Sequence, residues 1–517
     1  MSGSEKQKEK EISMKPYLMG IDIGTSACKV AVFDRTGTVR GVASCGYPVY
    51  YPRPGWAEQN PQEWWEAVCA ATGKLLREND IRPEKIAGIG IDGQSWSAIP
   101  VDRQGKVLAN TPIWMDTRAA SICDRLNEEI GAGEIFSLAG NSLQPSYTTA
   151  KILWYRENFP EIYEKIWKIL QSNSYIAFRL TGEVSQDLSQ GYGLHCFRME
   201  TGSWDAAMCE KLGIPMEFLP PVMACDAVVG AVTARAAAET GLCQGTPVVA
   251  GGLDAACGTL GAGVIRPGQT QEQGGQAGGM SICMDTCKAD PRLILGYHVI
   301  PGKWLLQGGT VGGGGVMRWF EKEFAAHERE EGRRTGISSL EQLNRMAAGV
   351  PAGSEGLVFL PYMAGERSPI WDPKAKGVFY GLDFSKTRGH MVRACMEGVA
   401  FSLRHNLDVA REAGARADIL CAVGGSANSR LWTQIKADIT GLPIAVPSSD
   451  TATTLGAAML AGKAVGMYRD YEEAVSLAVK ETRRHEPNRE NAAVYEENYQ
   501  MYLELYQSLK KMMDQGR

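Results

Sequence analysis

Asp22 stands near the end of an apolar segment, and only Ile23 separates it from the turn sequence Gly24-Thr25-Ser26. The backbone N–H groups and hydroxyls of such a turn can bind an anion, and a carboxylate beside it can hold a cation. The segment therefore predicts a site for a metal-bound phosphate, and the alternative is an ordinary β-turn with a solvated aspartate. It is not a Walker loop, because a strand follows the turn and no Gly-x-x-x-x-Gly-Lys-Ser/Thr sequence occurs.

Asp254 is the second carboxylate that could do chemistry. It follows Gly251-Gly252, where the missing side chains would let a ligand approach closely, and it precedes a stretch rich in alanine and glycine. A weakly polar neighbourhood of this kind can bring the pKa of a carboxyl group toward the range of a general base. The alternative is an aspartate that caps a helix beginning at Ala255.

Two further glycine clusters, at 308–315 and 424–425, could cradle a phosphate and a nucleobase, or could be tight turns. Together with the two distant aspartates they describe a cleft that holds a phosphoryl donor and positions an acceptor. The letters Gly88-x-Gly90-x-x-Gly93 match the dinucleotide fingerprint, but they fall inside a predicted strand rather than in the turn that opens a helix. We therefore reject a dinucleotide site.

The elements that must position these residues alternate between strands and helices. Asn60, Pro61 and Glu63 together form a helix start signal, so a helix is expected from Asn60 onward. Strands are predicted at 17–23, 28–33, 39–47, 86–91, 248–250 and 419–423, a hairpin at 269–284, and helices within 118–182 and at 430–440 and 491–513. This pattern indicates an α/β protein with two lobes of roughly 250 residues each.

Composition limits the classes of protein that this chain can belong to. Its 517 residues are 44% hydrophobic and 22% charged, so it can bury more than one core. A net charge of −5 with both signs interspersed leaves no electrostatic footprint for nucleic acid, and no apolar run is long enough to span a membrane. Thirteen scattered cysteines and the lack of an apolar leader favour the cytoplasm, and the six histidines lack the spacing of a zinc site.

Several longer stretches resemble the FGGY carbohydrate kinases, and among these most closely the xylulokinases. The resemblance is carried by PGWAEQNPQEWW at 54–65, WMDTR at 114–118 and SYTTAKILWYREN at 146–158, together with GVFYGL at 377–382, HM at 390–391 and ACME at 394–397. Only Tyr155 and Cys395 depart from the two diagnostic stretches of the family. Matches extend in family order from Tyr17 to about Gly462, so they cover most of the chain.

The resemblance implies an α/β fold of the actin-like ATPase (sugar kinase) superfamily, with two ribonuclease-H-like lobes and an active-site cleft between them that binds ATP and Mg²⁺. It implies a disordered tail at 1–14, an N-terminal lobe at 15–250 for the sugar and the phosphate turn, a C-terminal lobe at 251–485 for the nucleotide, and a C-terminal helix at 486–517. By position, Asp254 is the implied catalytic base, and Asp22 and Asp254 the implied metal ligands. The implied nucleotide and phosphate residues are Asp22, Gly24, Thr25, Ser26, Gly275, Gln276, Gly314, Gly425, Ser426 and Asn428, and the implied substrate residues are Gln94, Ser95, Trp96, Asp116 and Asp254.

Three residues depart from the xylulokinase pattern. Trp96 stands where a histidine is usual, Ala255 where an amide residue is usual, and Gln276 where a phosphate-contacting threonine is typical. An indole donates a hydrogen bond but cannot accept one, and Trp96 could stack on a less polar sugar face. A deoxysugar or another polyol therefore fits the sequence as well as xylulose does.

The implied function is ATP-dependent phosphorylation of a sugar hydroxyl, with D-xylulose or a related ketose or polyol as acceptor. The alternative is a kinase-derived sensor that binds sugar and nucleotide with weak or no turnover, which Ala255 and Gln276 motivate. An actin- or chaperone-like ATPase with a protein partner would leave the sugar-kinase stretches unexplained. We expect a small-molecule sugar as the partner, and neither nucleic acid nor membrane; a homodimer is compatible with the sequence.

Overall fold

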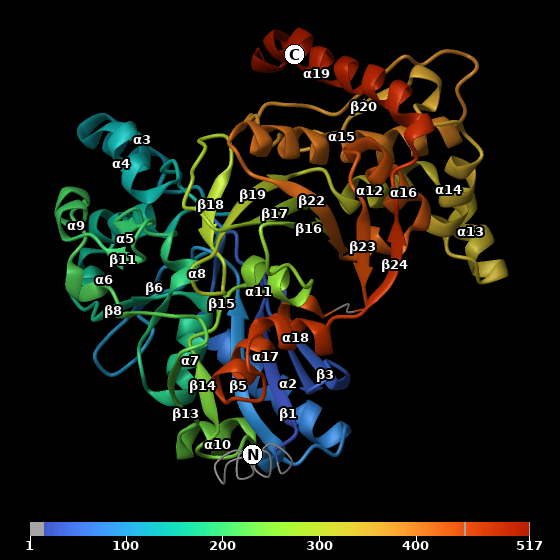
Figure 1. Ribbon diagram of the computed structural model, residues 1–517. Helices are drawn as coiled ribbons and strands as arrows, with labels where there is room; N and C mark the ends of the chain where they lie inside the picture. The colour runs from blue at the N-terminus through green and yellow to red at the C-terminus, as the bar shows by residue number, and fades with distance from the viewer. Residues whose placement is uncertain (1–14, 449–450, 516–517) are drawn as a thin grey trace.

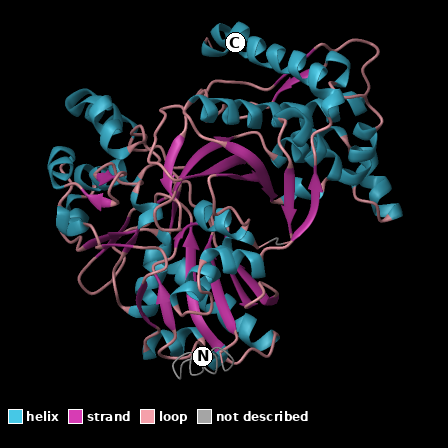
Figure 2. Cartoon of the chain, in the orientation of Figure 1, coloured by secondary structure: helices cyan, strands magenta, loops and turns pink. Residues whose placement is uncertain are grey.

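The computed structural model describes residues 15–448 and 451–515, so the predicted tail at 1–14 lies outside it. Figure 1 shows two lobes, a lower one that holds the start of the chain and an upper one that holds its end. Each lobe is built around a β-sheet that has seven strands within the described residues. Helices pack against both sheets (Figure 2), which confirms the predicted α/β class.

The N-terminal sheet begins with the predicted meander, in which β1 (Tyr17–Ile23), β2 (Ala27–Asp34) and β3 (Val39–Gly46) pair antiparallel. β5 (Ile86–Gly93) joins β1 in parallel, and this register places Asp22 directly opposite Asp92. The strand order is β13-β14-β5-β1-β2-β3, with β15 beside β5. The remaining strands of this sheet are β13 (Val228–Ala231), β14 (Pro247–Val249) and β15 (Gly252–Leu253).

Helix α2 (Pro61–Glu78) starts where the sequence predicts. Asn60 is its N-cap and accepts a hydrogen bond from the Gln62 backbone N–H at 3.0 Å. Its apolar side is buried against the meander. Strand β5 contains all three glycines of the dinucleotide fingerprint, Gly88, Gly90 and Gly93. They therefore lie in a strand, as predicted, and not in a turn that opens a helix.

The C-terminal sheet contains the predicted hairpin, β16 (Gly268–Gly274) and β17 (Gly278–Met284), and the predicted strand as β22 (Ala417–Val423). Its order is β18-β19-β17-β16-β22-β23-β24, with β18 (Ile294–Tyr297), β19 (Trp304–Thr310), β23 (Ile444–Pro447) and β24 (Glu481–His485). The main helices of this lobe are α12 (Gly314–Phe324), α13 (Ala326–Thr335), α14 (Ser339–Ala348), α15 (Arg388–Glu412), α16 (Arg430–Thr440) and α19 (Ala492–Asp514). The predicted helices at 430–440 and 491–513 are thus confirmed.

Helices dominate 118–182, as predicted, and most of them form a separate layer at the left of Figure 1. They are α3 (Ala120–Leu126), α4 (Ala132–Ala139), α5 (Thr148–Asn158), α6 (Pro160–Tyr163) and α7 (Ser172–Thr181). The segment also contains a short strand, β8 (Lys168–Leu170), which pairs with β6 (Ile99–Val101). No helix of the described residues is long and apolar enough to cross a membrane.

Helix α17 (Ala452–Ala464) packs on the N-terminal sheet, although it lies within the range predicted for the C-terminal lobe. The contact is backbone on backbone, because Cβ atoms on Gly20 of β1 and Gly90 of β5 would lie only 2.0 and 1.8 Å from carbonyl oxygens of α17. α17 also crosses α11 (Asp254–Gly261) at equally close range. A late segment of the chain is therefore inserted into the packing of the first lobe.

We expect Gly90→Ala to destabilise the chain by about 1–3 kcal/mol, because the new methyl group would overlap the Ala457 carbonyl oxygen. Chemical denaturation measures the loss. Gly133→Ala in α4 is the matched control, since nothing lies within 4 Å of the added Cβ, and it should be neutral or mildly stabilising. Equal stability of the two variants would contradict the close packing of α17 on β5.

Candidate active site

Three cavities adjoin one another where the two lobes meet. A middle cavity of about 250 Å³ contains Lys29, Asp254 and Thr453 in its lining. It shares Gly275 with a glycine-lined cavity of about 480 Å³ on the side of the C-terminal lobe. On its other side it shares Asp254 and Ala255 with a cavity of about 150 Å³ that we call the aromatic cavity. Asp254 therefore stands at the junction of two of the three spaces.

Asp22 lies beside the middle cavity. Its Oδ2 accepts a hydrogen bond from Thr453 Oγ1 of α17 at 3.1 Å, and Thr453 lines this cavity. Burial raises the pKa of Asp22, and hydrogen bonding to Asp92 and the charge of Lys29 partly offset that rise. Asp22 lines none of the three cavities itself, but through Thr453 it adjoins the middle cavity that Asp254 lines, 232 positions later in the sequence.

The predicted phosphate turn, Gly24-Thr25-Ser26, connects β1 to β2. The Gly24 backbone N–H donates to the Ala27 carbonyl at 3.2 Å, which closes the turn. The indole of Trp114 donates to Thr25 Oγ1 at 3.0 Å, and the side-chain amide of Gln59 donates to the Thr25 carbonyl at 2.9 Å. Neighbouring elements therefore hold the turn in one conformation.

Asp254 is the first residue of α11, and its Oδ1 accepts a hydrogen bond from the Ala255 backbone N–H at 2.6 Å. The N-cap position itself is occupied by Leu253. Burial, and secondarily the negative charge of Asp22, raise the pKa of Asp254 to about 7. A carboxyl group with a pKa near neutrality is suited to accept a proton from an alcohol at physiological pH.

Asp92 is a site residue that sequence reasoning missed. It is fully buried, and within the described part of the chain neither of its carboxyl oxygens has an assigned hydrogen-bond donor. Burial, followed by the charges of Asp22 and Asp254, raises its pKa well above the ordinary range. One sequence signal could have identified Asp92: it is a carboxylate inside an otherwise apolar strand. The same strand carries the glycines of the dinucleotide fingerprint, and attention to those glycines passed over Asp92.

The glycine-lined cavity gathers the implied nucleotide residues that lie outside the phosphate turn. They come from the β16–β17 turn, the start of α12 and the end of β22, and they are Gly275, Gln276, Gly314, Gly425, Ser426 and Asn428. The Gly314 backbone N–H donates to the Gly275 carbonyl at 2.7 Å, and Arg318 donates to the Gln276 side chain. Lys436 anchors Ser426 at 2.8 Å and pairs with Glu272 at 2.6 Å beneath it.

Trp96 and Ser95 line the aromatic cavity. The Trp96 ring stacks on Tyr147 with ring centroids 4.1 Å apart and meets Tyr192 edge-on at 5.9 Å. Its φ of 61° is a left-handed conformation rarely adopted by large residues, so the surrounding packing holds it there. Its indole nitrogen is buried without a hydrogen-bond partner among the described residues, so it can donate to a ligand.

Lys151 supports the aromatic cavity from behind and is a second residue that sequence reasoning passed over. Its ammonium group is fully buried and donates to three carbonyls, those of Trp96 at 2.8 Å, Ile113 at 2.8 Å and Ser146 at 2.6 Å. Burial lowers its pKa to about 7. One side chain therefore ties together three loops around the cavity.

Gln94 and Asp116 do not line the aromatic cavity. The Gln94 side chain donates to Gln59 Oε1 at 2.8 Å, beneath the phosphate turn. Asp116 is fully buried, accepts from the Ala57 backbone N–H at 2.7 Å, and pairs with Arg118 through both oxygens. A substrate contact by these two residues remains a prediction.

The carboxylates fit a bound Mg²⁺ in donor type. Mg²⁺ in phosphate-binding sites is usually held by one or two carboxylates together with phosphate oxygens and water. Asp22 and Asp254 supply such a pair, and the described residues contain no cluster of three or more carboxylate, histidine or cysteine ligands that would form an all-protein cage. The donor set thus suits a metal that arrives with a phosphate.

Two α/β lobes with backbone-lined and carboxylate-lined cavities between them define a phosphotransferase of the actin-like ATPase fold. Residues 17–261 match the N-terminal domain of the FGGY family of carbohydrate kinases, and residues 282–465 match its C-terminal domain. The chain belongs to this family, and it is a carbohydrate kinase.

Individual relatives cover almost the whole chain. It is 30% identical to xylulose kinase of Bacillus subtilis, over 96% of this chain and 98% of the relative. It is 32% identical to a gluconokinase of Bacillus licheniformis, over 96% and 97%. The crystal structure of xylulose kinase from Rhodospirillum rubrum has a TM-score of 0.86 and 31% identity, and covers 96% of this chain and all of that one.

Asp254→Ala is expected to lower kcat by about 10²- to 10⁴-fold, the usual contribution of a general base. In the unaltered chain the rate should rise as the pH increases through about 7, because the base acts only when ionised. Steady-state kinetics across pH 5.5 to 9 with a coupled ADP assay measures both effects. Normal turnover by the variant would remove Asp254 from this role.

Asp254→Asn is expected to raise the melting temperature at pH 8 relative to the unaltered chain. A raised carboxyl pKa means that the folded state binds more protons than the unfolded state between about pH 4 and 7, so stability falls as the pH rises through this window. The amide removes that cost, and the difference should shrink toward pH 5. Thermal melts at both pH values measure it, and a gain that is the same at both would contradict the assigned shift.

Lys151→Met is expected to raise the KM for the acceptor about tenfold with the KM for the nucleotide unchanged, because leaving buried carbonyls unpaired costs about 1–3 kcal/mol each and releases the Trp96 loop. Lys168→Met is the matched control. Lys168 also donates to two carbonyls, those of Glu217 and Leu219, but neither of these residues lines any of the three cavities, whereas Trp96 lines the aromatic cavity. An equal effect of both variants on the acceptor KM would show that Lys151 acts only through general stability.

Proposed function

We propose that this chain transfers the γ-phosphoryl group of ATP to a hydroxyl group of an open-chain sugar, D-xylulose or a related ketose or polyol. The observation that carries the proposal is the continuity of the three cavities through Gly275 and Asp254. A donor in the glycine-lined cavity and an acceptor in the aromatic cavity would meet in the middle cavity. Their reacting atoms would then lie beside Asp254, which lines both the middle cavity and the aromatic cavity and can act as a base.

The proposed reaction needs positioning and charge neutralisation more than covalent chemistry. Asp254 accepts the proton of the acceptor hydroxyl. The oxygen of that hydroxyl forms a bond to the γ-phosphorus, and the bond from the γ-phosphorus to the leaving oxygen of ADP breaks. Lys29 faces the middle cavity and supplies positive charge to the phosphates. Trp96 and Tyr192 exclude water from the acceptor side, where it would compete as a nucleophile.

Mg²⁺ is part of the proposal, held by Asp22 and Asp254 together with phosphate oxygens. The bound ion would neutralise phosphate charge and offset the mutual repulsion of the two carboxylates. Asp92 lies directly opposite Asp22 on the neighbouring strand, where it limits the positions open to the Asp22 carboxylate. Thr453 fixes the same carboxylate from the side of α17.

The gluconokinase relatives, together with Arg367, favour a second acceptor class, a sugar acid. The Arg367 side chain lines the aromatic cavity and, within the described part of the chain, forms no ion pair; its one side-chain contact is a long hydrogen bond of 3.5 Å to the Thr310 carbonyl. Burial lowers its pKa. The charge of Glu366 acts on this half-buried guanidinium but forms no ion pair with it among the described residues. The carboxylate of a sugar acid could supply the missing direct partner.

A panel of D-xylulose, other ketoses, polyols and D-gluconate, assayed for ADP release, tests the function and separates the two acceptor classes. Turnover of any one compound supports the kinase, whereas binding of sugar and nucleotide without turnover across the panel would support the sensor alternative.

Arg367→Gln distinguishes the two acceptor classes. If a sugar acid is the acceptor, kcat/KM for it should fall about 100-fold, the size of a lost charge-assisted pair, and neutral ketoses should be affected far less. Equal losses for both classes would exclude recognition of a carboxylate by Arg367.

A further inference from the structure

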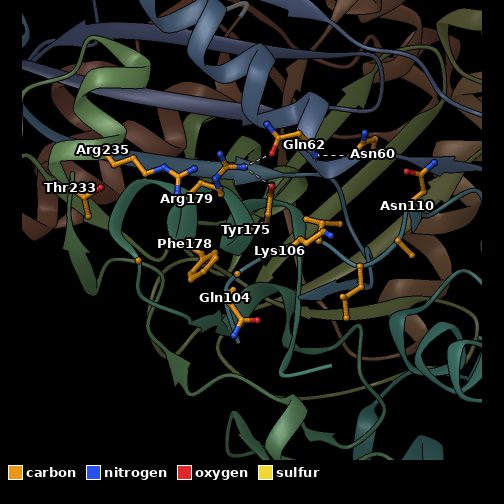
Figure 3. A pocket seen from close by; sticks show the side chains of 15 residues that line it. Asn60, Gln62, Gln104, Lys106, Asn110, Tyr175, Phe178, Arg179, Thr233 and Arg235 are labelled. Carbon is orange, nitrogen blue, oxygen red and sulfur yellow. Dashed lines mark hydrogen bonds between the residues drawn. The ribbon is translucent and has the colours of Figure 1, made fainter. Parts of the chain in front are cut away.

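A fourth and larger cavity, of about 770 Å³, lies away from the cleft on the outside of the N-terminal lobe. We call it the peripheral cavity. Figure 3 shows that it lies between the start of α2, the loop at 104–110, helix α7 and the start of α10 (Ala234–Thr240). It shares no lining residue with the three cavities of the cleft. A ligand bound there would not compete for space with a ligand in the cleft.

The charged side chains of the peripheral cavity are all cationic. Among the described residues that line it are Lys106, Arg179 and Arg235, and no aspartate or glutamate. Arg235 and Arg179 both lie near Glu239, at 2.8 and 3.5 Å, so this group retains a net positive charge. Lys106 lies on another wall, and its ammonium group makes no ion pair or hydrogen bond within the described chain. A lining of this kind attracts an anion.

Arg179 is held in place rather than mobile. It donates to Gln62 Oε1 at 2.7 Å and to the Tyr175 hydroxyl at 2.9 Å, both shown as dashed lines in Figure 3. Its guanidinium also lies over the Trp65 ring, 4.6 Å from the centroid. A guanidinium fixed in this way is preorganised to recognise a phosphate, because little side-chain entropy remains to be lost.

The rest of the lining suits a polyhydroxylated chain. Side-chain amides of Asn60, Gln62, Gln104 and Asn110 line the cavity. Asn60, Gln62 and Asn110 already make hydrogen bonds with other residues, whereas the Gln104 amide makes none among the described residues and can both donate and accept. The Phe178 ring lies between them, with its edge packed so closely on Gly105 that a Cβ there would come within 2.6 Å of it. An aromatic ring surrounded by amides can cover the C–H face of a sugar while the amides bind its hydroxyls.

We propose that the peripheral cavity is a second binding site, for a phosphate monoester of a sugar or polyol, separate from the catalytic cleft. Arg179, Arg235 and Lys106 attract and bind the phosphate, the free amide groups bind the hydroxyls, and Phe178 covers the carbon chain. The ligand class is that of a kinase product, but the site itself does not depend on which acceptor the cleft takes.

Isothermal titration tests the proposal on the full chain. The cleft is first saturated with a non-hydrolysable ATP analogue, and the base is removed by Asp254→Ala so that no turnover occurs. Ribose 5-phosphate, 6-phosphogluconate and glycerol 3-phosphate are then titrated, with ribose and inorganic phosphate as the two partial ligands. We expect at least one of the three phosphate esters to bind at one site per chain, and at least tenfold more tightly than either partial ligand.

Lys106→Glu and Arg235→Glu should each weaken this binding at least tenfold, and Phe178→Leu should weaken it while retaining an apolar side chain against Gly105. Arg103→Glu is the matched control, because it makes the same change of charge three residues from Lys106 but outside the lining, and it should leave the affinity unchanged. Absence of binding, equal losses in the control, or inorganic phosphate binding as tightly as the esters would overturn the proposal. This titration measures binding only, so its result does not depend on phosphoryl transfer. The proposal for the peripheral cavity and the proposed kinase function can therefore be refuted independently.

Discussion

The mutual repulsion of three neighbouring aspartates, Asp92 fully buried and Asp22 and Asp254 half-buried, is the constraint around which this structure is organised. Asp22 raises the pKa of Asp92 and of Asp254, and Asp254 in turn raises that of Asp92. Buried carboxylates close to one another oppose folding unless protons or cations are shared among them. The arrangement costs stability, and in the proposed function the same carboxylates bind a cation with its phosphate, a common relation between stability and function.

The close packing of α17 makes that arrangement possible. Glycines in β1 and β5 let the helix backbone approach the sheet directly, and this places Thr453 beside Asp22. The same helix crosses α11, whose first residue is Asp254. Two carboxylates from distant parts of the chain are thereby fixed relative to each other by backbone contacts, which are less adaptable than contacts between side chains.

On the acceptor side, two cationic side chains differ in how far their hydrogen-bonding capacity is used within the protein. Lys151 satisfies three carbonyls and keeps the strained Trp96 backbone in place, so its charge is fully used within the protein. Arg367 has no such set of partners, because its side chain makes only one long hydrogen bond within the described chain. A cation whose hydrogen-bonding capacity is fully used within the protein has a structural role, whereas a cation with unused capacity is a candidate for binding a ligand.

The sequence by itself determined the local features: the start of α2 at Asn60 and Pro61, the β1–β3 meander, the α/β class, and Asp22 and Asp254 as the carboxylates near glycine-rich turns. These depend on residues close together in the chain, whose spacing can be read directly. Only the tertiary structure decided that Asp92 faces Asp22, that Asp116 is paired with Arg118, that Lys151 supports the Trp96 loop and that α17 returns to the first lobe. Strand register and helix insertion are set by packing between segments that are far apart in the chain, and no local sequence pattern encodes how such segments fit together.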